Sequence, residues 1–181
     1  MEALKKLVRQ ASRERVDLRL FIHPIHASLQ EIIKYAGLWP AFEDWKRDLV
    51  QIASDQTSRQ TREVQLLDFS GYNRFTTEAQ TPSEALTPTM KWYYEALHYS
   101  KELGDRMLDR IYNYEHEGRI LPDDFGVLLN KNSIDGHLRL IREKQIEYER
   151  SHIDEKEIWI QRIEEIKKKR KSSDCYSRLG A

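Results

Sequence analysis

Two short apolar segments, with helical patterns before and between them, constrain most strongly what this chain can fold into. Residues 16–22 alternate between apolar and polar and then become continuously apolar, which is typical of a strand. A His-Pro pair follows, and proline cannot donate a hydrogen bond to a sheet, so the strand is expected to end there. Residues 64–69 have a similar character and stop at a Ser-Gly pair. This order of elements predicts an α/β fold.

The segment between the two predicted strands carries the signals of two helices. Ser28 and Glu31 have the spacing of a capping box, and Gly37 can take the left-handed conformation that ends a helix. Pro40 suits a first helical position, and a stripe over 4–11 predicts a further helix before the first strand. The residues expected to face the core recur at helical spacing: Leu29, Ile32, Ile33 and Ala36, then Phe42, Trp45, Leu49 and Ile52.

Beyond the second strand the pattern changes. Residues 72–88 have no clear period and hold two prolines, which predicts a long surface loop of the kind that often carries function. A helical stripe returns over 100–113. Residues 122–126 have the composition of a turn.

A long charged helix is predicted at the end of the chain. It begins near Ser133 and runs to about Lys171, with its first half packed on the domain. The second half ends in a basic run whose neighbouring glutamates dilute its field, so we expect a solvated helix end. The expected organisation is a domain over 1–150, followed over 151–181 by a charged helical extension and a frayed tail.

The composition excludes several classes of function. The 181 residues carry 30 Lys+Arg and 30 Asp+Glu, so a globally basic nucleic-acid binder is not expected. No stretch approaches the roughly 20 apolar residues of a membrane span, and the charged start has no apolar signal region. A single cysteine excludes an internal disulfide and a Cys-rich zinc site. No cofactor is expected, and the oligomeric state is not predicted.

An acid and a histidine three residues apart carry the main chemical hypothesis. In a helical turn, Glu95 and His98 would share a face, where the carboxylate would accept the proton of one imidazole nitrogen. The other nitrogen would then be left basic and aimed, as a general base must be to activate a hydroxyl nucleophile. Histidine suits the role because its unperturbed pKa is about 6.5. The alternative is a half-buried structural histidine that is bonded to the backbone.

Three segments carry a resemblance: Asp-Phe-Ser-Gly-Tyr-Asn at 68–73, Trp-Tyr-Tyr-Glu-Ala-Leu-His-Tyr at 92–99 and Lys-Glu-Leu-Gly-Asp at 101–105. They resemble the carboxyl-terminal half of bacterial SGNH/GDSL-like proteins associated with cell-surface polysaccharide gene clusters. These proteins are distantly similar to the D-alanine transfer protein of teichoic acid modification. The resemblance covers roughly 4–150. It implies a partial three-layer α/β/α, flavodoxin-like sheet and a Ser-His-acid triad.

Carried onto this sequence, the resemblance makes His98 the base and Glu95 its orienting carboxylate. The family more often has aspartate as the acid, and glutamate is one methylene longer, so Asp68 at a predicted strand end is a rival partner. The family's Gly-Asp-Ser nucleophile block and its amino-terminal signal anchor are missing from this sequence. The chain is therefore expected to be a truncated carboxyl-terminal portion, inactive without the half that bears the nucleophile. Ser70 is an alternative nucleophile, although a turn role explains it more simply.

Two histidines after the first predicted strand are further candidates. His23 and His26 could form a metal pair, but such a site would need a third ligand such as Asp68, and no metal is expected. A polar loop that contacts substrate is preferred. The candidate substrate contacts are His23, His26, Ser70, Tyr72 and Asn73. Four aromatic side chains could stack on sugar rings, with core or rim packing as the simpler assignment for each: Trp39, Trp45, Trp92 and Tyr72.

Two functional hypotheses follow from these observations. The first is an SGNH-like acyltransferase or esterase that acts on a surface polysaccharide or its acyl donor, with a polysaccharide or an acyl carrier as partner. The second is a non-catalytic interaction domain whose long C-terminal helix docks a partner. A nucleic-acid partner for the basic tail ranks lowest. The chain by itself is expected in the cytoplasm, whereas the resembled family faces the periplasm or the cell exterior.

Overall fold

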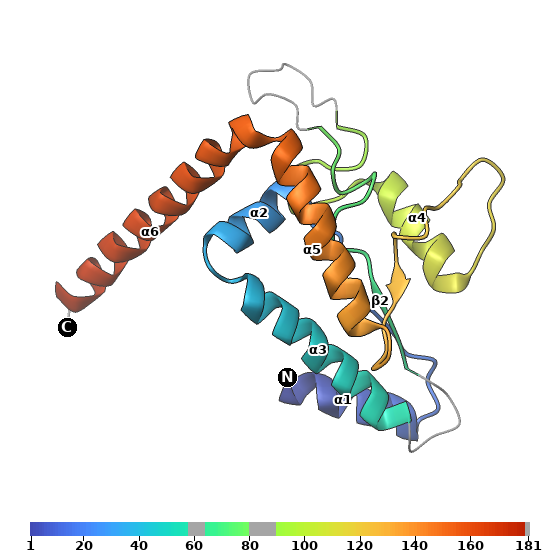
Figure 1. The fold of residues 1–181 in the computed structure, drawn as a ribbon. Helices are drawn as coiled ribbons and strands as arrows, with labels where there is room; N and C mark the ends of the chain where they lie inside the picture. The colour runs from blue at the N-terminus through green and yellow to red at the C-terminus, as the bar shows by residue number, and fades with distance from the viewer. Residues whose placement is uncertain (58–63, 80–89, 180–181) are drawn as a thin grey trace.

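The fold is known from a computed structural model that describes residues 1–57, 64–79 and 90–179 (Figure 1). It is a mixed α/β structure, as the sequence predicts. The helical elements are α1 (Glu2–Arg13), α2 (Ala27–Tyr35), α3 (Trp39–Thr57), α4 (Lys101–Tyr112), α5 (Ile134–Ser151), the short 3-10 helix η1 (Ile153–Glu155) and α6 (Lys156–Leu179). The strands are β1 (Arg19–Ile22), β2 (Gln65–Asp68) and β3 (Val127–Leu128).

A small sheet joins distant parts of the chain. β1 and β2 are parallel, with Arg19 opposite Gln65 and Ile22 opposite Asp68. β3 pairs antiparallel with β2, so β2 is the central strand in the order β1-β2-β3. The first strand begins at Arg19, later than its sequence pattern indicates, and β3 is too short to leave a pattern at all. The three-layer, flavodoxin-like arrangement stays a prediction.

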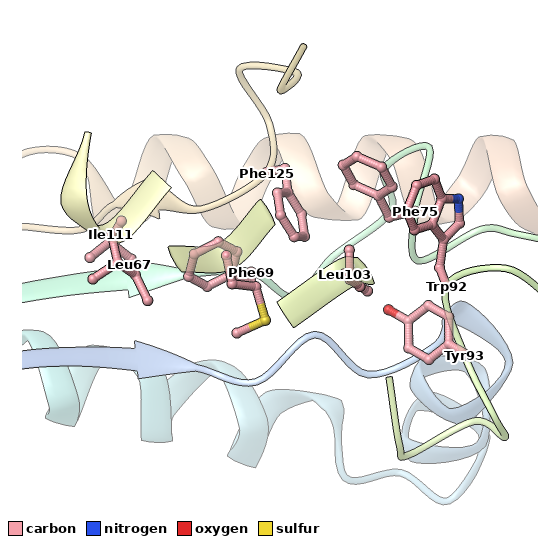
Figure 2. Close-up of a cluster of buried hydrophobic side chains, with 9 residues drawn as sticks. Leu67, Phe69, Phe75, Trp92, Tyr93, Leu103, Ile111 and Phe125 are labelled. Carbon is pink, nitrogen blue, oxygen red and sulfur yellow. The ribbon is translucent and has the colours of Figure 1, made fainter. Parts of the chain in front are cut away.

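The two faces of β2 pack into different apolar clusters. Leu66 lies in a cluster built mainly from β1, α3 and α5, with members Ile22, Leu49, Val50, Ala53, Leu129, Ile134 and Leu138. The next residue, Leu67, lies in a cluster of α4 and aromatic side chains, with members Phe69, Phe75, Trp92, Tyr93, Leu103, Met107, Ile111 and Phe125 (Figure 2). Successive strand residues point to opposite faces, which is why Leu66 and Leu67 lie in different clusters.

A third cluster joins α2, α5 and α6. Trp159 of α6 is 2% exposed, and its ring centroid lies 6.2 Å from that of Tyr35 and 6.1 Å from that of Tyr148. The predicted single helix from Ser133 to Lys171 is therefore wrong, since the chain turns at His152 and η1. One straight helix would separate residues 148 and 159 by ~16 Å along its axis, so their rings meet only because of this turn. Beyond that contact, α6 projects away from the rest of the molecule (Figure 1).

The buried face of α2 is more polar than its sequence indicates. His26 caps this helix, because its Nδ1 accepts the backbone N–H of Ser28 at 3.2 Å. Ser28 and Glu31 lie inside α2 and both are buried, so the capping-box prediction is wrong. The stripe of Leu29, Ile32, Ile33 and Ala36 is only partly buried. The predicted helix end is confirmed, with Gly37 at φ +77°.

Other predicted elements fare differently. The helix predicted over 100–113 is confirmed as α4, with Ser100 as its N-cap and Asn113 in the left-handed conformation at its C-cap. The turn over 122–126 is also confirmed. In α3, Leu49 and Ile52 are buried as predicted and Phe42 is partly buried, but Trp45 is 40% exposed. Of the predicted loop 72–88, the described part to residue 79 consists of turns and bends, and the rest lies outside the described residues.

Candidate functional site

A tight loop before α4 presents the predicted acid–base pair. Tyr93 and Tyr99 form an isolated antiparallel bridge, and the Tyr94 N–H donates to the His98 carbonyl at 2.9 Å. The Ser100 N–H closes the base of the loop by donating to the Trp92 carbonyl at 2.8 Å. Trp92 and Tyr93 are buried in the core (Figure 2), so the loop is anchored by its aromatic base while its tip faces solvent. We refer to residues 92–100 as the acid–base loop.

Glu95 organises the tip of this loop. Its carboxylate accepts the backbone N–H of Leu97 at 2.9 Å and that of His98 at 3.0 Å, and it pairs with Nδ1 of the His98 ring. The Leu97 N–H and the His98 ring hold the pKa of Glu95 below its ordinary value, because both favour the charged form. Nδ1 therefore carries the ring proton, and Nε2 has no hydrogen-bond partner among the described residues. With the His98 side chain 71% exposed, Nε2 can be reached by a reacting group.

The acid–base loop is docked at the carboxyl end of β1. The Ala96 carbonyl accepts the backbone N–H of His26 at 2.9 Å, and the Tyr93 hydroxyl donates to the Pro24 carbonyl at 3.3 Å. The Tyr99 ring meets the His23 ring edge-to-face at 4.9 Å. The carboxyl ends of parallel strands are where ligands collect in open α/β sheets. The fold thus carries Glu95 and His98 to the edge of the sheet at which a binding site is expected.

His23 is the candidate contact that the structure brings near this pair. Burial lowers its pKa, and the charge of nearby His98 lowers it further, which favours the neutral ring. Its Nδ1 is buried without a hydrogen-bond partner among the described residues. His23 therefore lies near His98, beside the Tyr99 ring at the end of the acid–base loop.

His26 has a structural role instead. It is 1% exposed, its Nδ1 accepts the Ser28 N–H, and its Nε2 donates to the Glu78 carbonyl at 2.6 Å. Burial lowers the pKa of the ring, in keeping with the neutral tautomer that these two bonds require. Both nitrogens are engaged, so a substrate or metal could bind His26 only by displacing a helix cap. Among the described parts of the chain, no three His, Cys, Asp or Glu side chains are grouped to hold a metal ion.

Asp68 lies at the end of β2 in a buried cluster that is separate from His98. Its Oδ2 accepts from Lys46 Nζ at 2.7 Å and from His137 Nε2 at 3.0 Å, and its Oδ1 accepts from the Ser70 hydroxyl at 2.7 Å. Burial alone would raise the pKa of Asp68, but the Lys46 ammonium and the His137 bond hold it well below its usual range. The carboxylate bonded to His98 is therefore Glu95, and Asp68 neutralises a buried lysine.

Ser70 is held by the same cluster. Lys46 Nζ donates to Ser70 Oγ at 2.6 Å, while the hydroxyl proton points to Asp68. The side chain is nearly inaccessible, with the whole residue 2% exposed. A hydroxyl whose proton faces a weakly basic carboxylate is not activated as a nucleophile. These contacts support the turn role for Ser70.

Tyr72 and Asn73 are also buried, at 5% exposure each. The Tyr72 hydroxyl donates to Glu31 Oε1 at 2.5 Å and accepts from Gln145 Nε2 at 2.8 Å. Asn73 Oδ1 accepts the backbone N–H of Phe75 at 3.0 Å, which folds the turn after β2. Both side chains help to organise the protein interior, and both residues also line a pocket beside α5.

Two members of the Asp68 cluster, Lys46 and His137, are not among the residues predicted from sequence. Lys46 lies four residues after Phe42 and three before Leu49, so it occupies an inward position of the α3 stripe. A lysine within an apolar stripe is the available signal for a buried ion pair. His137 sits in a polar stretch of sequence, and only the tertiary structure brings it to Asp68.

Comparison with known proteins adds no relative to the geometry described above. No protein-family model, curated protein or solved structure significantly matches this chain. Within the described residues there is no helix with the length and apolar character needed to cross a membrane.

Proposed function

We propose that this chain supplies the acid–base half of an SGNH-like acyltransferase or esterase that acts on a cell-surface polysaccharide or its acyl donor. The observation that carries the proposal is the Glu95–His98 pair, held on a docked loop at the carboxyl end of β1 with the second imidazole nitrogen open to solvent. A carboxylate on one nitrogen and an exposed basic nitrogen on the other are what a general base requires.

In this proposal His98 Nε2 removes the proton of an attacking hydroxyl as its oxygen bonds to the acyl carbon. The imidazolium then returns the proton to the departing alkoxide as the old ester bond breaks. Glu95 stabilises the imidazolium and keeps the ring oriented. No serine or threonine hydroxyl among the described residues is bonded to the His98 ring, so the attacking hydroxyl is assigned to a group outside the described residues.

The test is ester hydrolysis by this chain co-expressed with the polypeptide encoded immediately upstream of it. With 4-nitrophenyl acetate as substrate, His98→Ala should lower kcat by about 10²–10⁴-fold, the usual contribution of a positioned general base. Added imidazole should restore part of the lost turnover. The matched control is His116→Ala, since His116 is also exposed but lies between α4 and β3. Equal turnover in the two variants, or none in the unmodified pair, would contradict the proposal.

An interaction domain is the second candidate. The observation in its favour is α6, which projects from the body and has exposed apolar side chains at Ile158, Ile160 and Ile166. It predicts that His98→Ala leaves function intact, so the same variant separates the two candidates.

A further inference from the structure

Three cations gather on two touching aromatic rings at the base of the acid–base loop. The Lys91 ammonium lies 4.6 Å, and the Arg106 guanidinium carbon 4.5 Å, from the centroid of the Trp92 ring. The Arg74 guanidinium carbon lies 5.2 Å from the centroid of the Phe75 ring. The two rings meet edge-to-face at 4.9 Å and lie side by side in Figure 2. We call Arg74, Lys91 and Arg106 the basic patch.

None of these cations forms an ion pair with a carboxylate of the described residues. No ion pair within 4.0 Å involves Arg74, Lys91 or Arg106 in the described parts of the chain, whereas nearby Arg119 is paired with Asp109 at 2.8 Å. The Glu78 carboxylate adjoins the patch, where its oxygens accept the backbone N–H groups of residues 91 and 92 at 2.6 and 2.8 Å, and it offsets part of the positive charge. With three cations beside this one carboxylate, the basic patch still presents net positive charge on an apolar support.

The charges in the patch also oppose one another. Partial burial lowers the pKa of Arg106 and the positive charges of Arg119 and Arg74 lower it further, while the nearby carboxylates of Asp109 and Asp105 act in the opposite direction. One Arg106 N–H is used internally, because Nη1 donates to the Glu102 carbonyl at 2.9 Å. The remaining N–H groups of the guanidinium have no described acceptor. A bound oxyanion would relieve the repulsion and satisfy these donors.

The patch and the acid–base pair belong to one structural unit. The Ser100 hydroxyl donates to the Lys91 carbonyl at 2.8 Å, and the Ser100 N–H bonds to Trp92 across the loop base. Glu95 and His98 occupy the tip of that loop. A polymer bound across the patch would therefore pass close to His98, the proposed general base.

We propose that the basic patch binds the carboxylate or phosphate groups of an acidic polysaccharide and holds the polymer beside His98. This assignment of substrate class rests on the proposed function, because the acyl-transfer proposal explains why a polymer is held there. Arginine guanidinium groups match planar or tetrahedral oxyanions through paired N–H donors. The aromatic support keeps the cations oriented, and Arg106 is also partly buried, which strengthens its attraction for an anion.

The test measures binding of the purified full chain to polygalacturonate, a carboxylate polymer, to ribitol-phosphate teichoic acid, and to neutral dextran. We expect at least one acidic polymer to bind with an affinity that falls steeply as salt rises, and dextran not to bind. The acidic polymer that binds with the higher affinity shows whether the patch prefers carboxylate or phosphate groups. The double variant Arg74→Gln/Lys91→Gln, at two exposed positions, should weaken this binding by about tenfold or more.

Two sets of controls make the result specific. Lys6→Gln/Arg9→Gln removes the same charge from exposed positions on α1 and should change binding less than about twofold. His98→Ala should bind normally even if it abolishes turnover, so failure of the patch and failure of the acid–base pair give different results. Equal losses in the two double variants, equal binding of dextran, or tighter binding of a single-stranded oligonucleotide would each overturn the proposal.

Discussion

At the scale of single residues, the end of β2 depends on a buried charge pair. Lys46 and Asp68 are 1% and 0% exposed and lie 2.7 Å apart, with Ser70 and His137 completing the hydrogen bonds. Removing one partner of such a pair leaves an uncompensated charge in a poorly solvated site. The cluster therefore fixes the turn that leads from β2 towards residues 72–79.

We expect Lys46→Met to lower the free energy of unfolding by about 3–5 kcal/mol, because Asp68 would remain buried without its counter-ion. The control is Lys131→Met, which removes an exposed pair with Asp55 and should cost less than about 1 kcal/mol. Urea unfolding of both variants measures the difference. Similar costs for the two substitutions would show that the buried pair is not important for stability.

A second buried residue makes stability depend on pH. Burial raises the pKa of Glu31 to about 7, although its hydrogen bond from Tyr72 acts in the opposite direction. The folded state therefore binds a proton at Glu31 that the unfolded state, with a pKa of 4.5, has already released. Between these two values the free energy of unfolding must fall as pH rises, because the native state holds more protons.

The variant Glu31→Gln tests this dependence, since its amide stays neutral at every pH. Relative to the unmodified chain, the stability of the variant should increase from pH 5 to pH 8 by up to about 3 kcal/mol. Urea unfolding at pH 5, 6, 7 and 8 measures the difference at each value. A difference that does not change with pH would contradict a raised pKa for Glu31.

At the scale of elements, α6 is attached to the molecule through its first turns. Trp159 and Ile163 are buried, at 2% and 6% exposure, whereas Ile166 further along is 58% exposed. The Trp159 ring packs on Tyr35 of α2 and Tyr148 of α5. The contact of the Trp159 ring with Tyr35 and Tyr148 therefore fixes the orientation of α6 relative to α2 and α5, although the chain breaks at η1.

Trp159→Ala should release α6 from α2 while leaving the sheet in place. Truncating a buried tryptophan costs about 3–5 kcal/mol of stability. We expect this loss to exceed the free energy that holds α6 against the body, so that the helix detaches by local unfolding. Hydrogen exchange should accelerate in residues 156–168 and stay unchanged in β2. Ile166→Ala is the control and should have little effect, because that side chain is already exposed. Protection of α6 in both variants would show that other contacts hold the helix.

At the scale of the whole molecule, local patterns predicted several elements because their signals are local. The apolar runs located β1 and β2 within a few residues, and the stripe over 100–113 and the stop at Gly37 located helix ends correctly, although the Ser28–Glu31 capping box did not. The Glu95–His98 contact joins residues close in sequence, but the helical turn expected to bring them together is wrong, because both lie in a loop closed by the Tyr93–Tyr99 bridge. Its catalytic role, the SGNH-like resemblance and the division at residue 150 stay predictions.

Contacts between segments that are distant in sequence could not be predicted from local patterns. The turn between α5 and α6 exists because Trp159 finds Tyr35 and Tyr148, and no local signal marks that encounter. Likewise, α2 buries Ser28, Gln30 and Glu31 because polar partners surround it, among them the Gly71 backbone and the Tyr72 hydroxyl. Sequence patterning alone assigns such residues to the surface.

The sequence by itself determined the α/β class, the helices before α5 and the closeness of an acid to a histidine, because each depends on residues close together in the chain. The tertiary structure decided which charges are buried, where α6 turns and that Arg74 meets Lys91 and Arg106 around two aromatic rings. Those outcomes depend on burial and electrostatics between segments far apart in sequence, which become defined only when the chain is packed.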